Sequence, residues 1–263
     1  MKKGVVVLAG IALALAFCVP AVAQPSTKAV ETIVIDNFDT ADQMDWTWKV
    51  QASRFATKDD SVQYPLINYF DGIPNSLRPY HKDSDPAAKV LGVKTKFDRK
   101  GDNWFEVYPE YKDKKNANGE IIKEIPFVGT VTQIDFWVWG ANYLYYIELL
   151  VRDADGRVHV IPAGNLQFYG WRNVVVNVPG YIRQHTKQRS KEVNDLTFVG
   201  FRIRSDKNEY VDNFVVYFDQ IKYTTNTLSN IYDGYDLKDA DFGDSGSGSS
   251  GSSSSKTTTA PEK

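Results

Sequence analysis

The sequence contains very little cysteine, and this scarcity excludes several kinds of chemistry. Among 263 residues there is one cysteine, Cys18, which lies inside a predicted N-terminal signal peptide. The mature chain is therefore expected to contain no cysteine at all. Disulfides, thiolate catalysis and cysteine-ligated zinc are excluded from the mature protein on this basis.

Histidine is also scarce, and its distribution gives no support to histidine-dependent catalysis. The three histidines are His81, His159 and His185. None has a neighbour at the spacing of a metal-ligand pair, and each is expected to have a surface or turn role. Without a plausible base, a Ser-His-Asp mechanism has no support.

Long hydrophobic runs are missing except at the N-terminus. Residues 1–23 combine two early lysines, an apolar stretch and a small-x-small site ending at Ala23, which is typical of a cleaved signal peptide. The apolar stretch is too short to be kept as a membrane anchor. A lipoprotein with an acylated Cys18 is an alternative, but the bulky Phe17 before it fits that processing poorly. Export points to a bacterial periplasm or surface. Residues 24–29 are expected to be an N-terminal lead that precedes the folded domain.

The chain has no marked excess of basic residues. Removing the two lysines of the signal peptide leaves 29 basic against 33 acidic residues, and the mature formal charge becomes 29 − 33 = −4. Nucleic-acid binding requires a concentrated basic face, so this composition argues against it.

The C-terminal residues 236–263 have almost no apolar surface. Residues 245–255 are serine and glycine only, and such a segment cannot offset its chain entropy by burial. We predict a disordered tail. Serine-rich exported tails can carry O-glycans, but nothing in this pattern specifies them. What remains, residues 30–235, is the size of one β-sandwich domain.

The domain consists mainly of short runs with the two-residue period of β-strands. The predicted strands are residues 31–38, 46–52, 89–97, 103–108, 157–161, 171–178, 196–204 and 213–223, together with a hairpin over residues 130–153. One short basic helix is predicted over residues 181–191. The last strand is apolar in both phases, which indicates burial on both sides or a bulge. The pattern predicts an all-β, antiparallel β-sandwich of jelly-roll type.

The hairpin predicted over residues 130–153 is the centre of this interpretation. Two runs of β-branched and aromatic residues flank a break at residues 140–142, Gly-Ala-Asn, and such a break suits a tight reversal. Alternation places Ile134, Phe136 and Val138 on one side, which is expected to be core.

The opposite side of the first arm carries Asp135, Trp137 and Trp139. These tryptophans, beside an outward Tyr146, could stack on sugar rings or anchor a protein interface. Arg202 and Arg204, on a neighbouring strand, could cap the rings through cation–π contacts. Alternatively both faces are covered by the two sheets and the tryptophans are core. The sequence leaves these readings open.

Carboxylate pairs give weaker signals. Asp135 and Glu148 could serve a glycosidase only if both faced one cleft, and the paired-glutamate spacing of jelly-roll glucanases is absent. Asp36, Asp39 and Asp219 could meet if the terminal strands are neighbours and could then hold Ca²⁺. They can equally be turn and edge carboxylates. We assign no catalytic residue, metal or cofactor.

Particular segments resemble a known family. The opening IDNFDTADQMDWTW and the closing VYFDQIKY resemble the terminal strands of carbohydrate-binding jelly rolls of the galactose-binding-like group. Together with TQIDFWVWGANYLYYIELLVRDADGRVH, GWRNVVVNVP and the signal peptide, they resemble the spirochaete flagellar-filament outer-layer (sheath) protein family. The resemblance covers residues 32–233 and excludes the tail.

This resemblance implies a non-enzymatic role. Members of that family are exported to the periplasm and coat a core of flagellin subunits, alongside other sheath proteins. They influence filament stiffness or curvature, and so motility. The alternative hypothesis from the residues themselves is an exported carbohydrate-binding module that acts on a wall or surface glycan.

Overall fold

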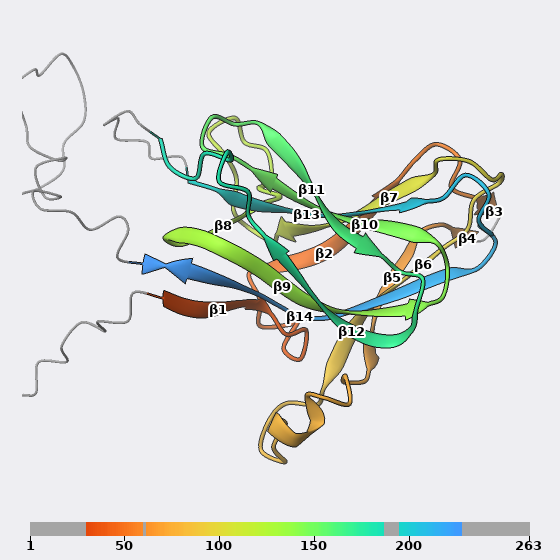
Figure 1. Ribbon diagram of the computed structural model, residues 1–263, viewed down its shortest axis with the longest axis horizontal. Helices are drawn as coiled ribbons and strands as arrows, with labels where there is room; N and C mark the ends of the chain where they lie inside the picture. The colour runs from red at the N-terminus through yellow and green to blue at the C-terminus, as the bar shows by residue number, and fades with distance from the viewer. Residues whose placement is uncertain (1–29, 60–61, 187–194, 228–263) are drawn as a thin grey trace, which may run out of the picture.

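The computed structural model describes residues 30–59, 62–186 and 195–227, which form two six-stranded antiparallel sheets packed face to face (Figure 1). Sheet A contains β12 (Tyr169–Asn177), β9 (Thr130–Ala141), β14 (Phe214–Asn226), β6 (Lys89–Thr95) and β5 (Leu66–Asp71) in that order, with β1 (Val30–Asp36) beside β14. Sheet B contains β11 (Val158–Asn165), β10 (Tyr145–Arg152), β13 (Thr197–Ser205), β7 (Trp104–Tyr111) and β2 (Trp46–Ala52), with β8 (Ile125–Pro126) beside β13. A small ribbon of β3 (Lys58–Asp59) and β4 (Val62–Gln63) and one 3₁₀ turn, Arg78–Tyr80, complete it.

The predicted all-β antiparallel sandwich of jelly-roll type is confirmed, including the strands over residues 31–38 and 46–52. The predicted signal peptide, N-terminal lead and tail lie outside the described residues. Within the part of the chain that the structure describes, no helix has the length and apolar character needed to span a membrane.

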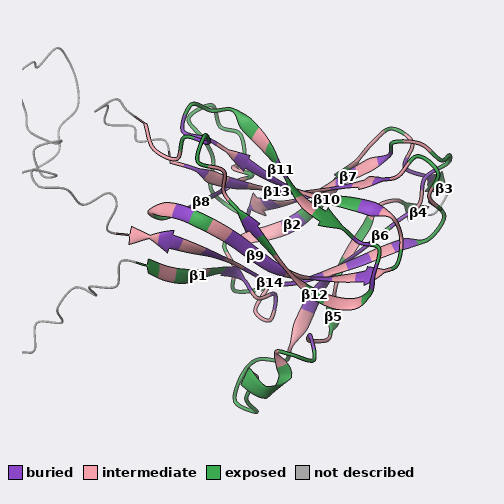
Figure 2. Ribbon diagram, in the orientation of Figure 1, coloured by how far each residue is buried: buried purple, intermediate pink, exposed green. Residues whose placement is uncertain are grey.

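The core lies between the inner faces of the two sheets, and the buried residues are distributed along the strands of both (Figure 2). Three fully buried rings join the sheets at its centre. The centroids of Phe136 in sheet A and Phe201 in sheet B are 4.6 Å apart, and Phe201 stacks on Phe218 at 5.0 Å. Ile134 and Val138 are fully buried beside them, so the predicted core seam of the first arm is confirmed.

The hairpin predicted over residues 130–153 is wrong. The first arm, β9, pairs with β12 and β14, whereas the second arm, β10, pairs with β11 and β13 in the other sheet. The chain crosses between sheets after Asn142, whose φ is 63°. The Asn142 N–H donates to Phe168 O at 2.8 Å, and the Leu166 N–H donates to Tyr145 O at 2.8 Å. These backbone hydrogen bonds join two segments that cross between the sheets. In a hairpin, the corresponding bonds would join the two arms of the hairpin to each other.

The helix predicted over residues 181–191 is also not found where the structure describes the chain. Residues 181–186 form a turn and an isolated bridge instead. The carbonyl of Arg183 accepts the N–H of Ala154 at 2.9 Å, a long-range bond that holds this backbone in a non-helical course. The remainder of the prediction, residues 187–191, lies outside the described residues.

The last strand, β14, contains a bulge, which is one of the two alternatives that its sequence indicated. Its pairing register with β9 shifts between Asp219 and Lys222, and Gln220 has a φ of 45°. Phe218 before the bulge and Ile221 after it both face the core and are fully buried. The bulge changes the phase of the alternation, so the core-facing residues are Phe214, Val216 and Phe218 before it and Ile221 and Tyr223 after it.

We predict that Phe136→Ala lowers the free energy of unfolding by about 3–5 kcal/mol, because it removes a fully buried ring and leaves a cavity between the sheets. Chemical denaturation followed by tryptophan fluorescence measures the loss. The control is Tyr80→Ala, whose side chain is 79% exposed and whose loss should stay within about 0.5 kcal/mol. Equal losses for the two variants would contradict this account of the core.

Candidate functional site

The outer face of sheet A carries six aromatic side chains, which we call the aromatic face. They come from β5, β9, β12 and β14, and the pairing register puts their strands side by side. The aromatic face consists of Phe70, Trp137, Trp139, Tyr169, Trp171 and Tyr217. Strand alternation turns all of them away from the core, because their neighbours in the chain are the residues that face inward.

Three rings of the aromatic face, those of Phe70, Tyr217 and Trp139, pack against one another in a row. The centroid of Tyr217 lies 5.4 Å from Trp139 and 5.7 Å from Phe70, in both cases edge to face. Gly92 of β6 lies beneath this row. A Cβ on Gly92 would come within 2.6 Å of the Phe70 ring and 2.8 Å of the Tyr217 ring. The missing side chain therefore allows the row to continue from β14 to β5.

Trp137 and Trp139 are half-buried on this outer face. The reading in which the two sheets enclose them as core is therefore wrong. Around them the face exposes apolar surface, with Phe70 46%, Val175 52% and Tyr169 80% exposed. Contiguous exposed apolar surface rimmed by polar groups is typical of a binding surface. That these residues bind a partner or glycan stays a prediction.

Asp135 is placed beside these tryptophans but is not available as a free carboxylate. Its side chain is almost fully buried. Lys222 Nζ lies 3.3 Å from Asp135 Oδ1, and Asn173 Nδ2 donates to the same oxygen at 3.3 Å. Three neighbouring strands each contribute one of these groups, so the buried charge is balanced and hydrogen-bonded. Asp135 therefore holds the surface together rather than offering a reactive group.

Asp219 lies opposite Trp137 in the strand pairing and is only 4% exposed. Burial raises the pKa of Asp219 to about 7, and the nearby charges of Asp39 and Asp36 add to the rise, although the Gln220 N–H opposes it. A carboxyl that is partly protonated near neutral pH can both donate and accept hydrogen bonds.

The same three carboxylates were considered as a calcium site. Asp36 accepts the Phe38 N–H at 2.7 Å and the Trp48 indole N–H at 2.8 Å, and Asp39 accepts the Lys89 N–H at 2.9 Å. Over residues 30–59, 62–186 and 195–227, no group of three or more acidic or histidine side chains is placed to hold a metal ion. The structure favours the alternative reading of turn and edge carboxylates.

The remaining predicted site residues lie on the outer face of sheet B, on the opposite side of the sandwich. Arg202 and Glu106 form an ion pair with a nitrogen–oxygen distance of 2.6 Å. Arg204 lies 3.2 Å from Glu148 and 3.2 Å from Asp102. Tyr146, on the same face, donates its hydroxyl to Asp206 at 3.4 Å. We call these cross-strand pairs the charged ladder.

Two proposals from the sequence are therefore wrong. Arg202 and Arg204 do not cap Trp137 and Trp139, because the two pairs belong to different sheets; Arg202 lies over Trp104 instead, 5.8 Å from its ring centroid. Asp135 and Glu148 cannot act across one cleft, because they project from opposite outer faces of the sandwich. The geometry gives no glycosidase pair at these positions.

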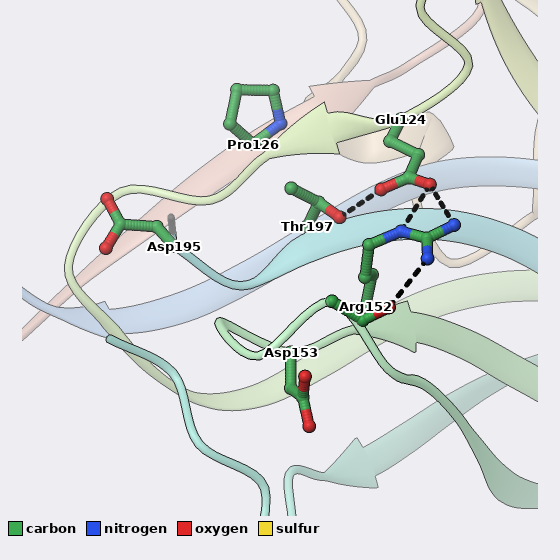
Figure 3. Close-up of a pocket in the computed structure, with 7 residues that line it drawn as sticks. Glu124, Pro126, Arg152, Asp153, Asp195 and Thr197 are labelled. Atoms are coloured by element: carbon green, nitrogen blue, oxygen red, sulfur yellow. Dashed lines mark hydrogen bonds and ion pairs between the residues drawn. The ribbon is translucent and has the colours of Figure 1, made fainter. Parts of the chain in front are cut away.

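A polar cavity of about 400 Å³ lies at one end of sheet B. Figure 3 shows Glu124, Arg152 and Thr197 drawn together in it, with Asp153 and Asp195 lying apart from this group. Glu124 accepts hydrogen bonds from Thr197 Oγ1 at 2.6 Å and from Arg152 Nε at 2.8 Å. These side chains are committed to one another, which favours a structural role for the cavity lining.

Two histidines near this cavity form pairs that sequence spacing did not reveal. His159 Nε2 lies 2.6 Å from Asp153 Oδ2. Burial opposes ionisation of Asp153, but the hydrogen bonds from His159 and from nearby backbone N–H groups lower its pKa overall. His185 lies 2.9 Å from Asp195 and 2.9 Å from Thr130 Oγ1. The cavity of Figure 3 is lined by Asp195 but not by His185 or Thr130, so only the Asp195 end of this row of contacts reaches it.

Four of the six residues of the aromatic face lie outside the sequence prediction. Phe70, Tyr169, Trp171 and Tyr217 were not identified as site residues, although the period of two places Trp171 in phase with the outward Asn173. Tyr217 lies just before the bulge, where alternation is hard to follow. Phe70 lies between Pro65 and Pro74, in a stretch outside the predicted strands.

Comparison with known proteins gives consistent findings. The model of a family described as flagellar filament outer layer protein matches residues 28–230. A putative flagellar filament outer layer-like protein of Brachyspira hyodysenteriae is 23% identical over 206 residues, covering 78% of this chain and 84% of that protein. A flagellar filament outer layer protein of Treponema pallidum is 31% identical over 121 residues, covering 41% of this chain and 34% of that protein.

Solved structures similar to this one include carbohydrate-binding modules. One, from the β-sandwich superfamily, has 12% identity and a TM-score of 0.43, covering 72% of this chain and 61% of that one. The family 11 module of a Clostridium thermocellum cellulosomal cellulase has 10% identity and a TM-score of 0.39, covering 74% and 95%.

We predict that the free energy of unfolding falls less between about pH 4 and pH 7 in Asp219→Asn than in the wild-type protein. The folded pKa of Asp219 is raised to about 7, above the unfolded value of about 3.9. Across this window the folded state binds more protons than the unfolded state, so stability falls as pH rises and is lost once pH exceeds the folded pKa. Asparagine removes this contribution and can still accept the Gln220 N–H.

The measurement is the free energy of unfolding of both proteins at several pH values from 4 to 8. The difference between variant and wild type should move in favour of the variant as pH rises. An unchanged difference across this range would show that Asp219 titrates normally.

Proposed function

The chain belongs to the flagellar filament outer layer protein family, and we propose that it is a non-enzymatic structural subunit of the outer layer of the periplasmic flagellar filament. In this proposal the mature protein is exported to the periplasm after cleavage of residues 1–23. It contacts the flagellin core or another sheath protein, and it supports filament shape or stiffness and thereby motility.

The observation that carries this proposal is the aromatic face. A subunit of a coat must present one surface to the structure that it covers. That surface needs side chains whose burial on binding is energetically favourable. Trp and Tyr side chains are such anchors at protein interfaces. Here the rings of Trp139, Tyr217 and Phe70 support one another on a rigid sheet, so little side-chain entropy is lost on docking.

The two outer faces differ in a way that suits a layer. The arginines of the charged ladder are paired with carboxylates of the same subunit. These ion pairs satisfy both arginines within the subunit, without a charged group from a partner. We assign the aromatic face to the filament side and the charged ladder to the solvent side. The cross-strand partners of Glu106 and Glu148 also account for these carboxylates without an enzymatic role.

A second candidate function is glycan binding, and one observation favours it. The cross-strand neighbours of Trp137 are Asn173, which is half-buried, and Asp219, which is buried, so a half-buried amide flanks the aromatic ring. Sugars are recognised by this combination of a flat apolar ring and nearby hydrogen-bonding groups. Flat calorimetric titrations of the mature protein across a panel of soluble wall and surface glycans would exclude this alternative.

We predict that Trp137→Ala combined with Trp139→Ala releases the protein from the filament. Truncation of anchors at the centre of an interface costs more than about 1 kcal/mol each, and the filament-bound fraction should fall at least about tenfold. Filaments sheared and purified from cells that produce the variant are analysed by quantitative mass spectrometry. Thermal melting followed by circular dichroism checks that the variant is folded.

Trp104→Ala is the matched control, because Trp104 is also half-buried but lies on the outer face of sheet B. This variant should remain on filaments at the wild-type level. Release of Trp104→Ala with retention of the double variant would reverse the assignment of faces. Recovery of the wild-type protein only in the soluble periplasm would overturn the proposed function itself.

A further inference from the structure

Strand β12 forms one border of sheet A, and its outer edge is free of any other strand among residues 30–59, 62–186 and 195–227. It pairs with β9 along its whole length on one side. On its other side, no strand of the described part of the chain pairs with it. An edge strand points alternate N–H and C=O groups outward, which makes it a template for a further strand.

Features that normally protect an edge from pairing are weak in β12. The neighbouring edges show them: β11 contains Pro162, β2 contains an exposed Lys49, and β1 is bulged before Asp36. Strand β12 has no proline, lysine or carboxylate over its nine residues. Its one charge, the Arg172 guanidinium, lies 4.1 Å from the ring centroid of Phe168 in its own chain.

The sequence of β12, YGWRNVVVN, is suited to pairing with itself in the antiparallel direction. Its central residue is Asn173. A register centred there pairs Trp171 with the Val175 of a second copy, twice by symmetry. Aromatic and β-branched residues opposite each other are a favourable cross-strand pair. The same register pairs Arg172 with Val174, so the two arginines do not meet, whereas a register centred on Arg172 would oppose like charges.

We propose that two copies of this chain associate through their β12 edges, antiparallel and centred on Asn173, to form one continuous sheet across a two-fold axis. The contact covers Val175, which is 52% exposed, and the edge of Tyr169, which is 80% exposed. An isologous contact of this kind is closed at two copies. It stands on the β12 edge alone and does not depend on the proposed function.

The absence of cysteine from the mature chain allows a direct test. In the proposed register the two copies of residue 173 are directly opposite, with Cα atoms about 4.5–5.5 Å apart. This distance is within the range of about 4.4–6.8 Å that a disulfide spans. The mature protein with Asn173→Cys should therefore form a disulfide-linked dimer under mild oxidation, seen on non-reducing gels and reversed by a reductant.

The register is tested by variants on the same face of the same strand. In Val175→Cys the two cysteines are four residues out of register, about 13 Å apart, and they should not cross-link. Adding Trp171→Cys to Val175→Cys restores an opposed pair and should restore the dimer. The proposal is overturned if Asn173→Cys stays monomeric, or if Val175→Cys alone cross-links equally well, since that would indicate random collision.

A second readout avoids cysteine. Val175→Lys places a charge against Trp171 of the other copy and should convert dimer to monomer in analytical ultracentrifugation. Val160→Lys on β11 is the control and should leave the dimer intact. A wild-type protein that is monomeric at all concentrations up to solubility would also overturn the proposal. The tryptophan variants are measured on purified filaments, whereas this dimer is measured in solution. The filament assignment and the β12 dimer can therefore fail independently of each other.

Discussion

The contact on which the structure depends is the packing of Phe136, Phe201 and Phe218 between the two sheets. These rings are fully buried, and Phe136 and Phe201 lie 4.6 Å apart across the sandwich. Because side chains alternate along a strand, committing Phe136 to the core commits Trp137 to the outer face. The aromatic face therefore follows from the core: it consists of the residues in phase opposite to the seam that holds the sheets together.

This dependence explains which parts were predictable from sequence. The inner side of β9, with Ile134, Phe136 and Val138, follows from local alternation, and the prediction is confirmed. The hairpin prediction fails because a Gly-Ala-Asn break looks the same whether the chain returns within one sheet or crosses to the other. The choice is made by distant groups, since Asn142 bonds to Phe168 rather than to its own hairpin partner.

The error about the hairpin also explains the error about the site. With β9 and β10 assumed to be neighbours, Tyr146, Arg202 and Arg204 were grouped with Trp137 and Trp139. Separating the two strands into different sheets moves the first three to the opposite face, where Arg202 and Arg204 have carboxylate partners. The row that does form, through Tyr217 and Phe70, depends on pairings over long sequence separations and on the small Gly92. No local pattern contains that information.

The two surfaces proposed above are geometrically compatible. The two-fold axis of an antiparallel strand pair is perpendicular to the sheet, so a dimer through β12 presents the same face of both copies to one side. The two aromatic faces would then form one surface of twice the width, with Trp171 of each copy near the axis, and both charged ladders would face the other way. Linking two modest binding faces in this way raises the effective concentration of the second once the first has docked. A filament with many repeated sites is the kind of partner for which such a dimer would bind more tightly than a monomer.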